Sequence, residues 1–282
     1  MADAVRRSQR ASEPLFLQRA LVALTLLFLG LFLVVPLGFI FASALAQGRQ
    51  VLVASLTHPD AWRAISLSLQ ATAFSVISAT VFGLAAAWFL GRTRFPGRDL
   101  WIAILDLPFA ISPVVAGLMF ILIFGASGLF GPWLDRHDLM LVFAKPGILM
   151  VTAFVTFPFV ARELLPLVET LSPETEEAAH LLGASSFQTL WRVTLPSIKW
   201  GLFHGVVLCA SRAMGEFGAV SVVSGHIRGL TMTLPLHIEA VYNEYQFSAA
   251  FACASLLSLL ALVSLALKAF IGWRARQARE EA

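Results

Sequence analysis

Long runs of hydrophobic residues, free or nearly free of charge, alternate along the chain with polar segments. A helix needs about 17–25 apolar residues to cross the roughly 30 Å hydrocarbon core of a bilayer, and six of the runs reach that length. They lie between Arg19 and Arg49, between Arg63 and Arg92, and at residues 100–124, 144–161, 200–224 and 247–273. The pattern predicts an all-α integral membrane protein with six transmembrane helices.

Two of the runs have features that bear on how they cross the membrane. The first follows basic residues and ends in Ala44-Leu45-Ala46, as a cleaved signal peptide would. Because it is much longer than the roughly 7–15 apolar residues of such a peptide, we expect an uncleaved spanning helix. The third contains Pro108 and Pro113, which predict a broken or kinked helix. It also carries Asp106, which we expect at the membrane interface.

The distribution of Lys and Arg predicts the orientation. Six spans place both termini on one side of the membrane. Fourteen of the 20 Lys and Arg residues fall on that side, five fall on the other, and Arg212 lies within a span. Because cytoplasmic loops carry the excess of positive charge, both termini are expected in the cytoplasm. The expected organisation is an N-terminal tail 1–19, a membrane domain 20–273 and a C-terminal tail 274–282.

The composition excludes several functional classes. Hydrophobic residues make up 58% of the chain, charged residues make up 13%, and the mean hydropathy is +0.80. A chain with so few charges could not cover its surface as a water-soluble enzyme, and it is too hydrophobic to be disordered. The net charge of +3 comes from residues that flank the spans, so no nucleic-acid partner is expected. Cys209 and Cys253 lie inside apolar runs, and we interpret both as small apolar residues.

The longest polar connection contains a pattern typical of two short helices separated by a turn. Ser172 is expected to cap the first helix, with Pro and several acidic residues in its first turn. Gly183 is expected to end that helix, where a residue with a positive φ is favoured. Ser185 or its neighbour would cap the second helix, and Pro196 would end it and begin the turn into the fifth span. The prediction is a cytoplasmic helix-turn-helix at residues 172–196.

The spacing within this loop resembles the EAA motif of ABC importer permeases. That motif reads Glu-Ala-Ala, three residues, Gly, nine residues, Ile, one residue, Leu-Pro. The matching residues are Glu177, Ala178, Ala179, Gly183, Leu195 and Pro196, with Val193 in place of Ile. The resemblance implies a coupling helix that docks in a groove of a cytoplasmic ATPase subunit, with Phe187 and Trp191 as bulky anchors. ATP and Mg²⁺ would be held by that partner, and this chain would carry no cofactor.

Residues 210–225, followed by 234–247, resemble the sulfate/thiosulfate group of these permeases. The first stretch contains Arg212-Ala-Met-Gly215-Glu216-Phe-Gly, and the resemblance extends over nearly all the chain from about residue 20. It implies the type I ABC importer permease fold in a bacterial inner membrane and sulfate or thiosulfate as substrate. It also implies an external sulfate-binding protein and a second, homologous permease subunit in a heterodimer. A molybdate or tungstate permease acting as a homodimer stays open, because the related molybdate permeases carry a version of this segment.

Arg212 and Glu216 place two charges within the fifth run, where a charge at the bilayer centre costs at least ~2.5–3.5 kcal/mol. Because they are four residues apart, we expect them on one helix face. Two interpretations stay open: a neutral pair that fixes the span against its neighbours, or an arginine that faces the pathway and lowers the barrier to a dianion. The small residues Ser211, Gly215 and Ser221 would either allow close helix packing or face the anion.

Residues 125–145 and 226–246 are polar segments on the external side and are the candidate docking surfaces for a substrate-binding protein. A short surface helix is expected between Pro235 and Tyr245, with Ile238 on one face. The alternative for both segments is an exposed loop without a partner.

Two other classes of membrane protein are disfavoured. Gly125-Ala126-Ser127-Gly128 matches a short pattern of intramembrane serine proteases, but His204 is the only intramembrane base and is expected near the opposite face. A secondary transporter needs its own ion-coupling site, and the sequence has neither a visible repeat nor a cluster of carboxylates. The chain also lacks a GxxxxGK[ST] sequence, so it is not expected to hydrolyse ATP. The other five histidines lack metal-ligand spacing and are expected at the surface, without metal.

Overall fold

The structure is a computed structural model that describes residues 15–280, and every regular element in this range is a helix, as the sequence predicts. In chain order the elements are α2 (Leu15–Leu29), η1 (Gly30–Val34), α3 (Val35–Leu45), α4 (Arg49–Thr57), α5 (Pro59–Arg92), α6 (Arg98–Ala110), α7 (Pro113–Phe124), α8 (Gly131–Arg136), α9 (Lys145–Thr156), α10 (Pro158–Thr170), α11 (Pro173–Leu181), α12 (Ser186–Thr189), η2 (Leu190–Thr194), α13 (Leu195–Met214), α14 (Gly218–Val223), α15 (Leu234–Asn243) and α16 (Phe247–Glu280).

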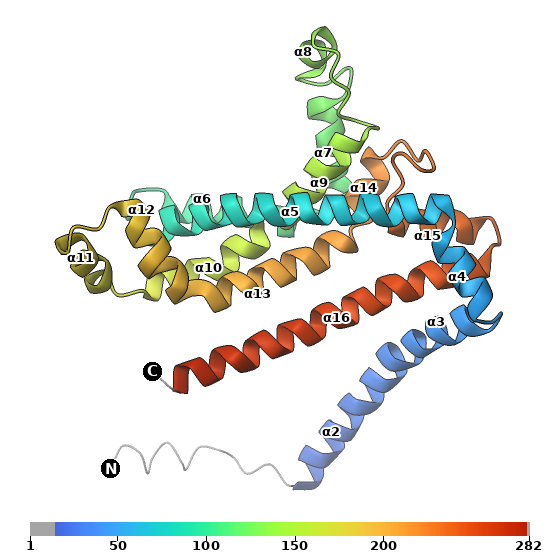
Figure 1. The fold of residues 1–282 in the computed structure, drawn as a ribbon, viewed down its shortest axis with the longest axis horizontal. Helices are drawn as coiled ribbons and strands as arrows, with labels where there is room; N and C mark the ends of the chain where they lie inside the picture. The colour runs from blue at the N-terminus through green and yellow to red at the C-terminus, as the bar shows by residue number, and fades with distance from the viewer. Residues whose placement is uncertain (1–14, 281–282) are drawn as a thin grey trace.

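The six apolar runs become five continuous helical spans and one broken span. The continuous spans cover Phe16–Leu45, Pro59–Arg92, Lys145–Thr170, Ser186–Met214 and Phe247–Arg274. The remaining run forms α6 and α7, which are bent by 107° at the break between them. Long helices such as α5, α13 and α16 run across the molecule, with α11 at one end and α15 at the other (Figure 1).

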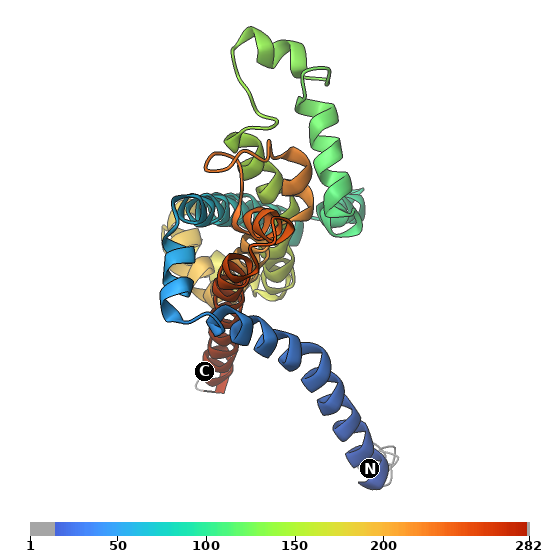
Figure 2. The ribbon, with the colours of Figure 1, turned by 90° about the vertical axis from the view of Figure 1, so that its right-hand side faces the viewer.

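The break between α6 and α7 is where the proline pattern predicts an interruption. Ile111 and Ser112 have extended backbone, with ψ of 135° and 137°, and Pro113 begins α7. A proline disfavours helical backbone in the residue before it, so Ser112 cannot continue α6. Pro108, in contrast, lies inside α6 and does not end it. The bend sends α7 away from the body of the molecule toward α8 (Figures 1 and 2).

The body is built around α5, which packs against α9, α10 and α13. Small residues allow this approach: a Cβ atom at Gly83 of α5 would lie 3.0 Å from the backbone nitrogen of Ala161 in α10. Between spanning helices, such close contact supplies van der Waals attraction that replaces the missing hydrophobic driving force. The contact is completed by the buried aliphatic residues Val160, Leu164 and Val168 of α10 and Ile198 of α13.

The first span lies largely outside this body. Within the chain its apolar window is 0% buried, and α2 extends away from the other helices (Figure 2). Its second half packs on the body, where α3 contacts α16 and the rings of Phe39 and Phe251 meet edge to face at 5.9 Å. The span therefore exposes most of its apolar surface.

The fifth span differs from the prediction at both ends. Pro196 does not end the preceding helix, because α12, η2 and α13 form one continuous helix from Ser186 to Met214. The π-helical turn η2 lies directly before the proline, and the Leu195 N–H donates to the Leu190 carbonyl five residues earlier. This wider turn accommodates a proline that an α-helix would not. At the other end, Gly215–Phe217 interrupts the helix before α14, so 200–224 is not one helix.

The structure describes only part of each predicted tail. Residues 1–14 of the N-terminal tail 1–19 lie outside the described residues, and α2 begins at Leu15. Within the C-terminal tail 274–282, α16 continues to Glu280. The division into two tails and a membrane domain remains a prediction.

Candidate functional site

The loop at residues 172–196 forms the expected helix-turn-helix, with α11 and α12 joined at Gly183. Gly183 has a φ of +85°, and its N–H donates to the His180 carbonyl at 2.9 Å. The Ala184 N–H donates to the Ala179 carbonyl at 3.0 Å. Because residues with a side chain rarely adopt this φ, the local sequence determines where the chain turns.

Serine residues begin both short helices, but only one of their side chains caps. The Ser185 hydroxyl accepts from the Gln188 N–H at 3.3 Å, and the Gln188 side-chain oxygen accepts from the Ser185 N–H at 2.9 Å. This reciprocal capping box fixes the start of α12. Ser172 occupies the N-cap position of α11 without a side-chain hydrogen bond, so its predicted capping bond is absent.

The helix-turn-helix presents apolar side chains to solvent at one end of the molecule. Leu181 and Leu182 are each 89% exposed, Phe187 is 69% exposed and Trp191 is 58% exposed. The rings of Phe187 and Trp191 lie 6.0 Å apart. Beside them is an open cavity of about 300 Å³, lined by Ala179, Leu182, Gly183, Ala184, Gln188, Thr189, Arg192 and Val193. Several large apolar side chains exposed on one short segment are typical of a protein-binding site.

Two acidic neighbours in α11 have opposite environments. Glu177, the acid of the EAA motif, and Ala178 are exposed. The carboxylate of Glu176 instead turns back toward the spans, where it pairs with Arg92 at 2.8 Å. Sequence analysis missed this pair, because Arg92 precedes Glu176 by 84 residues and ends a different span.

Arg212 and Glu216 form an ion pair, but not along one helix face. The helix α13 ends at Met214, so Glu216 lies in the interruption before α14. Its Oε2 atom lies 2.5 Å from Arg212 Nη1, and its Oε1 atom accepts from the Ala219 N–H at 2.9 Å. The Glu216 side chain is 1% exposed, whereas that of Arg212 is 33% exposed. The carboxylate therefore fixes the first turn of α14 and joins it to α13.

The small residues near this pair do not form one site. Ser211 and Gly215 line a cavity of about 260 Å³ between α13 and α16, together with Met214, Leu257, Ser258, Ala261 and Ser264. Ser221 is not among the lining residues. Its hydroxyl donates to the Gly218 carbonyl at 2.9 Å within α14. The structure thus brings Ser211 and Gly215 together and leaves Ser221 in the short helix.

Two further polar pairs join α10 to its neighbours. Arg162 Nε lies 3.0 Å from Asp106 Oδ1 of α6, and His204 Nδ1 lies 2.7 Å from Glu163 Oε1. Asp106 was expected at the membrane interface, and its ion pair with Arg162 was not predicted. The contact with Glu163 gives His204 a role in joining α13 to α10. No described contact links His204 to Ser127, which gives the serine protease alternative no support.

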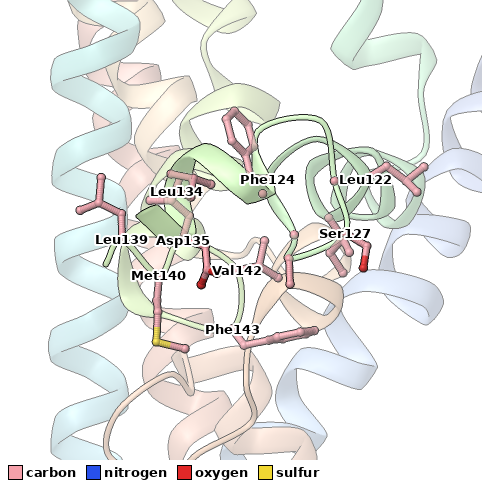
Figure 3. Close-up of a pocket in the computed structure, with 15 residues that line it drawn as sticks. Leu122, Phe124, Ser127, Leu134, Asp135, Leu139, Met140, Val142 and Phe143 are labelled. Atoms are coloured by element: carbon pink, nitrogen blue, oxygen red, sulfur yellow. The ribbon is translucent and has the colours of Figure 1, made fainter. Parts of the chain in front are cut away.

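The segment between α7 and α9 encloses an open cavity of about 430 Å³ (Figure 3). Apolar side chains dominate its lining, including Leu122, Phe124 and Val142, and Asp135 and Ser127 supply polar groups. Leu139 and Met140 lie at the surface, 49% and 79% exposed. Sequence analysis identified this segment, at residues 125–145, as a candidate docking surface.

The second candidate docking segment contains the expected short helix, α15, which begins at Leu234. Tyr242 is exposed, and its ring meets that of Phe247 at 5.2 Å. His237 is 5% exposed, so the expectation of a surface histidine is wrong here. Burial and the nearby Arg228 lower its pKa from the ordinary value of 6.5. Within residues 15–280, no three His, Cys, Asp or Glu side chains are grouped as a metal site requires.

Comparison with known proteins identifies the family. The model of the family described as "Binding-protein-dependent transport system inner membrane component" matches residues 79–277. The sulfate transport system permease protein CysW of Synechocystis sp. is 49% identical over 90% of this chain and 92% of its own length. CysW of Escherichia coli is 46% identical over 90% of this chain and 87% of its own length. The sulfate transport system permease protein CysT of Escherichia coli is 38% identical over 86% of this chain and 88% of its own length.

The fold has a counterpart among solved structures. The crystal structure of a bacterial ABC transporter involved in the import of the acidic polysaccharide alginate matches with a TM-score of 0.75 at 18% identity, over 93% of this chain and 96% of that chain. At this identity the likeness shows the fold alone. It agrees with the type I importer permease fold that the EAA spacing implies. The chain therefore belongs to the family of binding-protein-dependent transport system inner membrane components, and within it to the group of CysW sulfate transport system permeases.

Proposed function

We propose that this chain is the membrane permease subunit of an ATP-driven importer for sulfate and thiosulfate, in which it forms half of the translocation pathway. The identity of 46–49% to CysW permeases over about nine-tenths of the chain carries the substrate assignment. The exposed helix-turn-helix with EAA spacing supports the link to an ATPase. The importer would lie in the bacterial inner membrane, with both termini in the cytoplasm.

The energy for transport comes from a partner in this proposal. The sequence contains no GxxxxGK[ST] motif, so ATP and Mg²⁺ are bound by ATPase subunits. Leu181, Leu182, Phe187 and Trp191 supply the apolar contacts, and Glu177 and Ala178 lie on the exposed surface beside them. A groove that takes up a short helix buries such side chains and excludes water from them.

The second half of the pathway is supplied by a homologous permease chain. CysW and CysT are both named sulfate transport system permease proteins, and the chain is similar to both. A heterodimer of one CysW-type and one CysT-type subunit accounts for this pair of relatives. The external segments 125–145 and 226–246 then face a sulfate-binding protein. The solved alginate transporter has a structure with a periplasmic protein bound, which supports an arrangement of this kind.

Transport follows from a shift between two states. ATP binding closes the ATPase subunits and moves the coupling loops, and the pathway opens outward to receive the anion. ATP hydrolysis restores the inward-facing state. ATP shifts this equilibrium because the ATPase binds it with different affinity in the two states. Arg212 remains two-thirds buried in its pair with Glu216, so we assign the pair primarily to the junction of α13 and α14.

The first test is radiolabelled sulfate uptake by cells that lack this chain, with and without the chain restored. Thiosulfate and molybdate serve as competitors. The proposal requires restored uptake that thiosulfate blocks and trace molybdate hardly affects. Recovery of molybdate uptake instead would support the homodimeric molybdate or tungstate permease. Uptake that persists without any ATPase subunit would identify a secondary transporter.

A further inference from the structure

The Glu176 carboxylate connects three helical elements at the end of the molecule where α11 lies. Its Oε1 atom accepts from Arg92 Nη2 at 2.8 Å and from Thr194 Oγ1 at 3.0 Å. Arg92 is the last residue of α5, and Thr194 is the last residue of η2, which leads directly into α13. Glu176 itself lies in α11. A single carboxylate oxygen therefore joins the helix-turn-helix to the ends of two spans.

The surroundings of this carboxylate hold it in place. The side chains of Arg92 and Glu176 are only 18% and 17% exposed. The Arg92 guanidinium also donates through Nη1 to the Leu171 carbonyl at 3.1 Å and lies 5.3 Å from the centre of the Trp88 ring. A charged pair with several partners in a partly buried site has a defined geometry, whereas an exposed pair contributes little. This pair can therefore carry a displacement from one element to another.

The chain connectivity shows what the pair adds. Along the chain, the helix-turn-helix directly follows α10 and leads into α13. The helix α5 is separated from it by α6 to α10, so it has no direct chain connection to the loop. A second pair, between Arg98 and Glu169, joins the start of α6 to the end of α10 in the same region. Arg92 and Glu176 thus provide a direct polar link from the loop to α5, the helix at the centre of the body.

We infer that Glu176 is a positioning residue that transmits displacement of the coupling loop to α5 and α13, so that both spans move with the loop when the ATPase subunits close. The inference rests on the proposed function, because it requires an ATPase that moves the loop. It separates two roles within α11. Glu177 and the exposed apolar residues contact the ATPase, and Glu176 passes the movement inward.

The test uses the complete complex with its ATPase subunits, second permease chain and binding protein, reconstituted in vesicles. Glu176→Gln, Arg92→Gln and Thr194→Val are compared with the matched controls Glu174→Gln and Arg94→Gln. Both control residues are exposed, and neither has a partner in the described part of the chain. Two quantities are measured: the sulfate transported per ATP hydrolysed, and the amount of ATPase subunit that co-purifies.

The expected result is a fall in sulfate per ATP of about fivefold or more in Glu176→Gln and Arg92→Gln, with the ATPase subunit retained. Thr194→Val should give a smaller fall, because it removes one hydrogen bond to Glu176 and leaves the pair with Arg92. The double variant at residues 92 and 176 should be no worse than either single variant, because both remove one link. The controls should match the wild type. Wild-type coupling in Glu176→Gln would overturn the inference, as would loss of the ATPase subunit from that variant, which would show a role in shaping the loop. A wild-type complex that retains no ATPase subunit would overturn the proposed function as well.

Discussion

Glu216 accepts a hydrogen bond from the Ala219 N–H while its second carboxylate oxygen lies 2.5 Å from Arg212, so one side chain joins the end of α13 to the start of α14. The side chain is 1% exposed. A buried carboxylate without its cation is costly, because neither water nor another charge compensates it. The relationship therefore predicts that this pair stabilises the fold.

Arg212→Ala should lower the free energy of unfolding of the purified subunit by about 3 kcal/mol. This value is at the lower end of the usual cost of breaking a buried ion pair, because the Arg212 side chain is one-third exposed. Arg212→Ala combined with Glu216→Ala should recover part of this loss, because no unpaired charge remains. The measurement is thermal unfolding in detergent, with uptake normalised to the amount of folded protein. Normal stability with reduced uptake in Arg212→Ala would instead place Arg212 on the anion pathway.

Gly183→Pro should leave membrane insertion intact and abolish transport. Proline fixes φ near −65°, whereas Gly183 has a φ of +85°, and proline also removes the N–H that bonds to His180. A Cβ atom at this position would meet nothing within 4 Å, so the effect comes from the backbone alone. Gly183→Asn is the matched control, because Asn tolerates a positive φ, and it should retain most of the activity. Uptake and insertion are measured in the same cells, and normal uptake by Gly183→Pro would contradict the assignment of the loop.

The contrast between Gly183 and Pro196 shows which features the sequence can predict. The turn at Gly183 depends on its own φ and on neighbouring hydrogen bonds, so local rules identify it. Pro196 was expected to end a helix by the same kind of rule, but the π-helical turn before it lets the helix continue. The six spans were predicted because bilayer thickness constrains helix length directly. The pairs Arg92–Glu176 and Glu163–His204 depend on how the spans pack, which the spacing of residues within one segment does not encode.

The stability of the external region should depend on pH through His237. Burial, and then the charge of Arg228, lower the pKa of this imidazole from 6.5; Asp60 raises it and His58 lowers it by smaller amounts. In the unfolded chain His237 binds a proton as the pH falls through about 6.5, whereas the folded protein resists protonation. The folded state therefore loses stability as the pH falls below about 6.5 toward the lower folded pKa.

The measurement for His237 is thermal unfolding between about pH 5 and pH 8, where an unperturbed histidine changes its charge. His237→Gln should flatten the decline below pH 6.5, because it removes the group that takes up the proton. His137→Gln, at an exposed histidine, is measured in parallel as the matched control. If the stability of wild type and of His237→Gln fell equally below pH 6.5, this histidine would be ruled out as the source of the loss.

Trp191→Ala should weaken binding of the ATPase subunit without lowering the stability of the permease chain. The indole is 58% exposed and lies 6.0 Å from the Phe187 ring at the end of the molecule, so its removal leaves no cavity in the core. Buried aromatic anchors often cost more than 1 kcal/mol when truncated at an interface, and a loss of about tenfold in affinity is expected. Phe203→Ala on α13 is the matched control, because Phe203 is 54% exposed but lies outside the helix-turn-helix. Binding of purified ATPase subunit to the permease in detergent is measured for each variant. Equal affinity of wild type and Trp191→Ala would exclude this face of the loop from the ATPase interface.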